Sequence, residues 1–244
     1  MALGPNNRFG VNTGRMTHAQ AYDASIDMGL RKYMLGVYNY MTAGVAITGL
    51  VAYYVSTQPD LMQTLFGTGL SWLVILSPLA FVMILSFGIN KLSASATQML
   101  FWGFAAVMGL SLSTIFITYT NASVARVFFI SAGAFAGLSL YGYTTKRDLT
   151  GFGSFLIMGL IGILIASVVN IFLGSTGLEF VISVLGVLIF AGLTAYDTQR
   201  IKSIYYESDS AEVMTKKSVM GALTLYLDFI NLFMMLLRLF GNRN

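Results

Sequence analysis

The sequence predicts an all-α membrane protein, a bundle of seven transmembrane helices. Of its 244 residues, 56% are hydrophobic and only 10% are charged, whereas a soluble domain carries about 25% charged residues. The charged residues gather in short stretches, and the apolar runs between them are long enough to cross about 30 Å of hydrocarbon. This composition excludes a soluble fold.

The first apolar run begins only at Tyr33, after a polar stretch of mixed charge. We expect residues 1–32 to form a cytoplasmic tail, in which residues 18–32 are either a helix on the membrane surface or a loose segment. The run Tyr33–Ser56 is too long and too aromatic for a cleaved signal peptide. It is therefore interpreted as a retained transmembrane helix.

Six further apolar segments follow, each roughly 20 residues long and separated by turn residues or charges. The shortest separator, Gly174–Gly177, consists of four small residues. Together with the first run these segments form one transmembrane domain over residues 33–240, followed by a short tail at 241–244. The predicted spans are Leu70–Ile89, Gln98–Tyr119, Val124–Tyr143, Ser154–Gly174, Leu178–Gln199 and Val219–Phe240.

Two features inside the spans concern helix packing. Gly133 and Gly137 form a GxxxG pair, which predicts that the fourth span approaches a neighbouring helix closely. Pro78 removes a backbone donor from the second span and is expected to kink it.

Basic residues predict the orientation in the membrane. If the amino terminus is cytoplasmic, 11 of the 14 Lys and Arg residues fall on the inner side, and only Arg126, Arg238 and Arg243 fall outside. The positive-inside rule then places the amino terminus in the cytoplasm and, after seven spans, the carboxyl terminus outside.

The residue types also exclude several function classes. The chain has no cysteine and a single histidine, His18, so neither a disulfide framework nor a thiolate or histidine metal centre can be built. The basic residues form no run of the kind that binds nucleic acid. We expect no resident cofactor.

Two carboxylates lie inside predicted spans, where an ionisable group costs roughly 2.5–3.5 kcal/mol and therefore indicates a role. Asp197 lies near the inner end of the sixth span, and Asp228 about ten residues into the seventh. Both fall in the inner half of the membrane, so the two side chains can meet. The alternative is that each carboxylate bonds within the bundle and serves only its structure.

Polar and small residues form one stripe on each of the last two spans. These stripes are Ser183, Gly186, Thr194 and Asp197 on the sixth span, and Gly221, Thr224, Asp228, Asn231, Met235 and Arg238 on the seventh. Thr194, Thr224, Asn231 and Arg238 are therefore candidates to support the aspartate pair. For Arg238 the alternative is an interfacial anchor.

The segments Ala195–Gln199 and Leu225–Phe233, which carry the two aspartates, resemble the Bax inhibitor-1 (transmembrane Bax inhibitor motif) family. Gly109–Ser113 agrees with it, the likeness covers about residues 30–240, and the bacterial YccA-like branch matches best. The resemblance implies a seven-helix bundle whose last helix is central and surrounded by the other six. It also implies a bacterial inner-membrane location.

The resemblance implies two functions as well. The family is associated with pH-sensitive calcium leakage, in which paired aspartates, here Asp197 and Asp228, act as sensor and gate. The YccA-like branch is associated with the membrane-bound AAA protease FtsH as an inhibitor or modulator. Some relatives pair an arginine of the second helix with the sixth-helix aspartate, but Leu70–Ile89 contains no Lys, Arg or His.

The first hypothesis is therefore an ion leak. Two nearby carboxylates in a low dielectric cannot both ionise cheaply, so they should titrate in coupled steps. Oxygen ligands suit calcium, but stable binding takes six to eight of them, so Asp197 and Asp228 would hold the ion only weakly and in transit.

The second hypothesis is a non-channel membrane partner that modulates a protease through residues 1–32 and the loop Ser203–Ser218. An intramembrane aspartyl protease is disfavoured, because the Gly-x-Gly-Asp setting of such enzymes is absent around both aspartates. We expect no enzymatic activity.

Overall fold

The computed structural model describes residues 18–244, and the predictions made for residues 1–17 lie outside the described residues. The described part contains seven helical segments that are long and apolar enough to cross a membrane, which confirms the predicted all-α fold. Two of its helices, α4 and α5, together form one of these segments. The helices are α1 (His18–Ser56), α2 (Pro59–Phe66), α3 (Leu70–Gly88), α4 (Ala94–Leu112), α5 (Ile115–Thr118), α6 (Asn121–Thr144), α7 (Thr150–Leu173), α8 (Thr176–Ser203) and α9 (Ala211–Phe240).

Capping residues explain where the helices begin and end. A serine or threonine side chain accepts a hydrogen bond from a first-turn N–H at the start of α4, α6, α8 and α9. Helix α7 ends at Gly174, whose φ of 58° is the left-handed conformation that glycine adopts without steric cost. Ser175 then caps α8, so the predicted break at Gly174–Gly177 is confirmed.

Three helices differ from the sequence prediction. Helix α1 is continuous from His18, so residues 18–32 join the first span instead of forming a separate surface helix or a loose segment. Helix α2 forms where a turn was predicted, because Pro59 occupies its first turn, where a missing N–H costs nothing. Helix α9 begins at Ala211, eight residues before the predicted start, because Ser210 caps its polar first turns.

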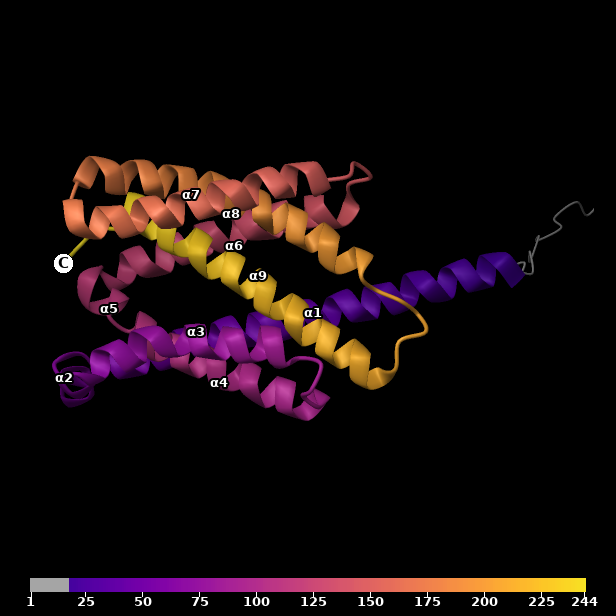
Figure 1. The fold of residues 1–244 in the computed structure, drawn as a ribbon, viewed down its shortest axis with the longest axis horizontal. Helices are drawn as coiled ribbons and strands as arrows, with labels where there is room; N and C mark the ends of the chain where they lie inside the picture. The colour runs from indigo at the N-terminus through magenta and orange to yellow at the C-terminus, as the bar shows by residue number, and fades with distance from the viewer. Residues whose placement is uncertain (1–17) are drawn as a thin grey trace, which may run out of the picture.

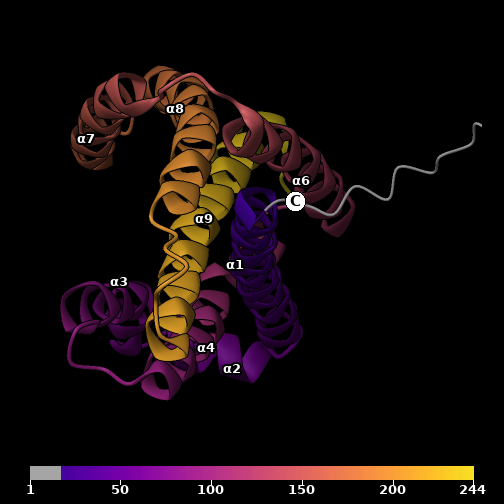
Figure 2. The same cartoon turned by 90° about the vertical axis from the view of Figure 1, so that its right-hand side faces the viewer.

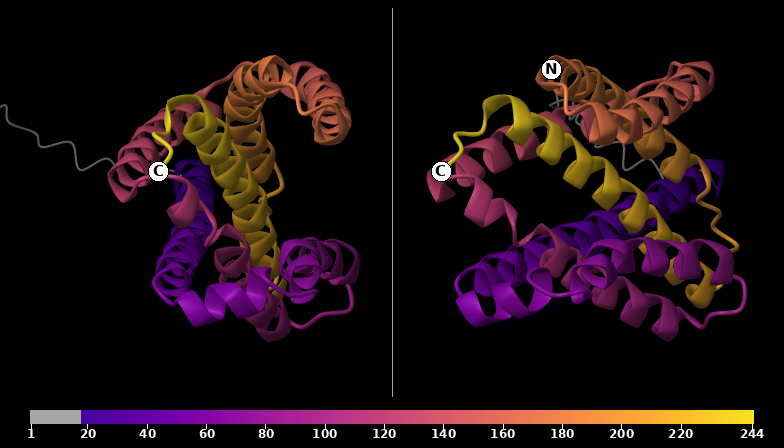
Figure 3. Two further views of the ribbon diagram at one scale, coloured as in Figure 1. Left: turned by 90° about the vertical axis from the view of Figure 1, so that its left-hand side faces the viewer. Right: turned by 60° about the vertical axis from the view of Figure 1, so that its left-hand side comes forward.

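Helix α9 crosses the bundle diagonally between two groups of helices (Figures 1 and 2). It packs against α1 and α4 on one side and against α6 and α8 on the other, as the two views of Figure 3 also show. In its most apolar stretch, 67% of the residues are buried, against 11% to 39% in the other spans. The last helix is therefore central, but it does not pack equally on all six others: α3 packs on α4 and α7 packs on α8, at the periphery.

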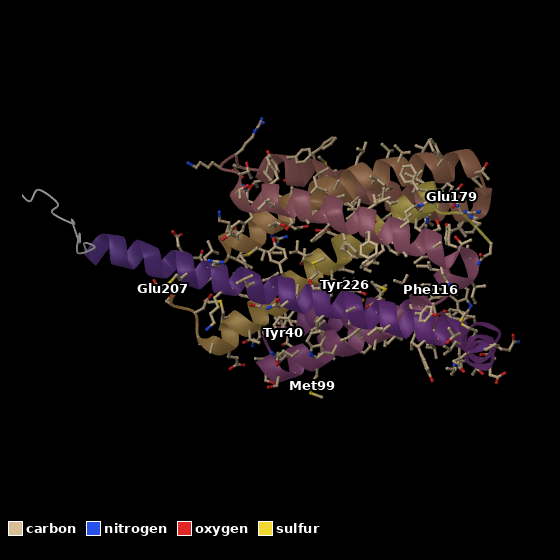
Figure 4. The ribbon with its side chains drawn as sticks, turned by 180° about the vertical axis from the view of Figure 1, so that it is seen from behind. Tyr40, Met99, Phe116, Glu179, Glu207 and Tyr226 are labelled. Carbon is tan, nitrogen blue, oxygen red and sulfur yellow. The ribbon has the colours of Figure 1, made fainter. Side chains whose placement is uncertain are left out.

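The core follows the two halves of α9. Its first half packs with α1 and α4 around Tyr226, which lies mid-bundle in Figure 4 and contacts the rings of Phe101 and Phe104. The Tyr226 hydroxyl bonds Thr48 Oγ1 on α1 at 2.7 Å. Its second half packs with α6, α7 and α8 through residues such as Leu232.

The predicted close approach at Gly133 and Gly137 is wrong. A Cβ atom built on either glycine meets nothing within 4 Å, so this face of α6 is open. The tight contact of α6 is instead at Gly142, where an added Cβ would clash with the backbone of Ala195 on α8. Small-residue spacing identifies a face that permits close packing, but not whether a neighbour lies against that face.

Pro78 is buried inside α3, and the helix continues through it from Leu70 to Gly88. The lack of a backbone N–H at Pro78 therefore does not end the helix.

The two ends of the bundle differ in charge and in construction. We call the end at which α1 begins the basic end, because seven lysines and arginines gather in its loops and helix termini: Lys91, Lys146, Arg147, Arg200, Lys202, Lys216 and Lys217. At the opposite end the tail 241–244 lies against the junction of α5 and α6. The Thr120 N–H donates to Asn242 O at 3.0 Å, and Arg243 is 3.5 Å from a Glu179 carboxylate oxygen.

Candidate functional site

Two glycines bring α8 and α9 together along antiparallel directions. A Cβ on Gly221 of α9 would lie 3.0 Å from Ile201 of α8, and a Cβ on Gly186 of α8 would lie 2.8 Å from Met235 of α9. The two contacts lie on either side of the aspartates along both helices. The small residues of the predicted stripes therefore allow the close contact that places the two aspartates opposite each other.

The carboxyl groups of Asp197 and Asp228 face each other closely enough for the charge of one to act on the other. Both residues are buried, with 8% and 5% of their surface exposed. Within the described residues no N–H or hydroxyl group donates to Asp228 Oδ2, which leaves the facing Asp197 carboxyl as a group with which Asp228 can share a proton. A pair of carboxyl groups that shares one proton carries one negative charge.

Arg200 supplies a countercharge from one side of the pair. Its Nη1 atom is 4.0 Å from Asp197 Oδ1, and its side chain is 64% exposed at the basic end. Some relatives place the basic partner of this aspartate in the second span, but Leu70–Ile89 contains no Lys, Arg or His, and Arg200 was not predicted as the partner. The i, i+3 spacing from Asp197 to Arg200 on one helix is the sequence signal that could have found it.

The four candidate supporting residues have other positions or partners. Thr194, Thr224 and Asn231 each donate to the carbonyl oxygen one turn earlier on their own helix, at 2.8 to 3.1 Å. Arg238 is exposed in the last turn of α9, ten residues beyond Asp228 and thus about 15 Å along the helix. The structure therefore does not bring Arg238 to the pair and places it where an interfacial anchor would lie.

A chain of hydroxyl groups next to the pair was not predicted. Tyr38 on α1 is 2.6 Å from Ser139 Oγ on α6, and Ser139 is 2.9 Å from Thr198 Oγ1 on α8. Since Thr198 donates its proton to Thr194 O, Ser139 donates to Thr198 and Tyr38 donates to Ser139. These contacts tie three helices together beside Asp197. No sequence spacing links three residues so far apart in the chain.

The site offers few ligands for a resident metal ion. The described residues contain no group of three or more His, Cys, Asp or Glu side chains that could hold one, whereas calcium takes six to eight oxygen ligands. What the arrangement can do chemically is bind or release a proton and thereby change the charge between two helices.

Comparison with known proteins tests the resemblance of the aspartate motifs. The family model described as "Inhibitor of apoptosis-promoting Bax1" matches residues 30–244. The chain belongs to the Bax inhibitor-1 family. The resemblance inferred from the aspartate motifs is thereby confirmed, and the chain is a membrane protein of this family.

Bacterial relatives cover nearly the whole chain. This Bax inhibitor-1 protein is 52% identical over 218 residues to "Inner membrane protein YbhL" of Escherichia coli (strain K12), covering 88% of this chain and 93% of YbhL. It is 47% identical over 219 residues to "Uncharacterized protein RP147" of Rickettsia prowazekii (strain Madrid E), covering 90% and 93%. A protein of Caulobacter vibrioides is 47% identical over 246 residues, covering 96% and 98%.

Proposed function

We propose that this Bax inhibitor-1 protein is a pH-sensitive ion leak of a bacterial inner membrane rather than an enzyme, with calcium as the permeant ion. The observation that carries the proposal is the buried pair of Asp197 and Asp228, whose carboxyl groups face each other from consecutive membrane-spanning helices. Calcium contacts these carboxylates in transit and is not a resident cofactor.

The gate works through the charge of the pair. With one proton, the pair carries one negative charge that Arg200 balances. Loss of this proton places two negative charges together, and two unit charges 4 Å apart repel by about 4 kcal/mol at an effective dielectric constant of 20. Gain of a second proton removes the attraction to Arg200. Either change disturbs the contact of α8 with α9, and α9 contacts four of the other spans.

The charge of the bundle ends supports a topology for this leak. Lys146, Arg147, Lys202 and their neighbours make one end strongly basic, and the positive-inside rule assigns such an end to the cytoplasm. The amino terminus is then cytoplasmic and the carboxyl terminus external.

Calcium flux in proteoliposomes tests the proposal. The full chain is reconstituted into calcium-loaded liposomes, and release is followed from about pH 4 to about pH 9, a range that covers strongly coupled carboxyl groups. We expect a minimum of flux where the pair holds one proton and a rise on either side of it. Release equal to that of protein-free liposomes at every pH would overturn the proposal.

A second candidate function is contact with a membrane-bound AAA protease of the FtsH type. Helix α1 projects beyond the other helices at the basic end (Figures 1 and 4). The loop 204–210 lies beside it, since the rings of Tyr33 and Tyr205 are 5.7 Å apart. Lys217 holds this loop through Asp209, at 2.6 Å, and the carbonyl of Ile204, at 2.8 Å. The projection and the anchored loop together offer a defined surface to a partner.

Deletion of residues 1–20 separates the two candidates. The deletion removes the start of α1 and residues 1–17, which lie outside the described residues, but it spares the span Asp27–Ser56. If the protease hypothesis holds, the shortened protein no longer co-purifies with the protease after mild detergent extraction, while calcium flux is unchanged. Equal recovery of the protease with the full and the shortened chain would exclude residues 1–20 as the contact.

A further inference from the structure

A cavity of about 840 Å³ lies between α1 and α6. Its α1 wall runs from Arg31 to Ala46, its α6 wall from Phe128 to Tyr143, and Phe229 of α9 forms its floor. Helix α1 packs on α4 and α9, while α6 packs on α8 and α9, so part of α9 lies between α1 and α6 (Figures 2 and 3). We call this space the α1–α6 groove.

The groove opens sideways, toward the hydrocarbon of the membrane. Several of its lining residues are exposed on the surface of membrane-spanning segments, among them Leu35, Ala46, Ala136 and Leu140. A second cavity of about 390 Å³ shares Phe229 and two other lining residues with the first and continues it toward the opposite end of the bundle. Molecules of the bilayer therefore have direct access to the groove.

Polarity along the groove is uneven. Most of its lining is apolar, and Arg31 lies at the basic end. Tyr143 lines the same end, and Lys202 Nζ lies 5.0 Å from the centre of its ring. The hydroxyls of Tyr38 on the α1 wall and Ser139 on the α6 wall bond each other and join the two walls. Two cations at one end and hydrocarbon along the rest are complementary to an amphiphile with an anionic head.

The length of the groove matches one leaflet of a bilayer. Arg31 to Ala46 and Phe128 to Tyr143 each comprise 16 residues, whose ends lie about 22 Å apart along the helix. Half of a bilayer with its headgroups is likewise about 20–22 Å. Basic pockets between transmembrane helices are known to bind anionic lipid headgroups.

We propose that one anionic phospholipid of the leaflet at the basic end occupies the α1–α6 groove. Its phosphate lies between Arg31 and Lys202, and an acyl chain runs along the small residues of both walls to Phe229. The lipid fills the space between α1 and α6 on the open side of the Tyr38–Ser139 bond. This inference does not depend on the ion leak, because it concerns a different face of α9 from the aspartate pair.

Native mass spectrometry of the full chain tests the proposal. The protein in mild detergent is titrated with dioleoyl phosphatidylglycerol and, separately, with dioleoyl phosphatidylcholine. We expect one tightly retained phosphatidylglycerol, bound at least about fivefold more tightly than phosphatidylcholine, since fivefold is about 1 kcal/mol, the contribution of a single basic residue. Arg31→Gln should remove this preference, and Lys32→Gln, a neighbouring exposed residue outside the lining, should keep it.

A pair of matched variants locates the lipid. Ala136→Phe fills the groove and should abolish retention, whereas Ala134→Phe, on the same helix but outside the lining, should not. Both positions are exposed, so neither substitution disturbs the core. Equal retention by the two variants would overturn the proposal, and so would a dimer mass without lipid, which would assign the groove to a second copy of the chain.

Discussion

Replacing Asp228 by asparagine is expected to abolish the rise of calcium flux on the alkaline side of its minimum. The amide donates a hydrogen bond to the ionised Asp197 carboxylate, so the variant keeps the charge and the hydrogen bond of the singly protonated pair as the pH rises. An amide costs less inside a membrane than an ionised carboxylate, so the variant should insert and fold. The acid side of the profile should persist, because Asp197 can still take up a proton.

The expected loss on the alkaline side is at least about tenfold. Tenfold corresponds to about 1.4 kcal/mol, well below the repulsion of about 4 kcal/mol that the second charge introduces. The measurement is the proteoliposome flux profile. Thr224→Val is the matched control, because Thr224 lies on the same stripe of α9 but bonds only a carbonyl of its own helix in the described structure.

The double variant provides the decisive comparison. If Asp197 and Asp228 act as one unit, the flux of the double Asn variant on the alkaline side should differ little from that of the more affected single variant, since the effects of residues in contact are not additive. Independent, additive effects of the two single substitutions on flux would show that the pair is not the sensor.

The second large expected effect is on the free energy of unfolding of the bundle. Gly142→Leu is expected to destabilise the bundle by at least about 1–3 kcal/mol, the usual cost of inserting atoms into a filled core. A side chain at Gly142 meets the backbone of Ala195, which cannot move without shifting α8. Because Asp197 follows two residues later on α8, this shift should also disturb the aspartate pair.

Gly137→Leu is the control for this experiment. It lies on the same helix and changes the same residue type, but nothing stands within 4 Å of an added Cβ. Reversible unfolding of the two variants by denaturant in mixed micelles measures the difference in the free energy of unfolding. Equal destabilisation would show that close packing at Gly142 is not what holds α6 against α8.

Features that depend on neighbours along the chain could be read from the sequence. The lengths of the apolar runs predict seven spans, because crossing the hydrocarbon sets a minimum length for each helix. The break at Gly174 follows from its own backbone freedom and from the capping serine beside it. The motifs around Asp197 and Asp228 were specific enough to indicate the family, which the comparison confirms.

Features that depend on which faces meet could not be read in this way. The GxxxG pair of Gly133 and Gly137 has the spacing of a packing face, yet no neighbouring atom lies within 4 Å of a Cβ added there. Arg200 could have been predicted as the partner of Asp197 from its spacing on the same helix. The hydroxyl chain from Tyr38 to Thr198 could not have been predicted. Its three members come from helices that are distant in the chain.

The sequence by itself therefore determined the class of the protein, the number of spans and the two carboxylates that a membrane would not otherwise tolerate. The length of an apolar run, the capping of a helix end and the cost of burying a charge each depend on a single segment of the chain. Each can therefore be recognised in the local amino-acid sequence. Only the tertiary structure decided that α9 runs diagonally through the centre, that its aspartate faces that of α8, and that a groove lies between α1 and α6. Lipid is as apolar as the side chains of the spans, so hydrophobicity does not choose which helices touch. That choice is made by shape, through glycines such as Gly142 and Gly186 that let particular backbones approach.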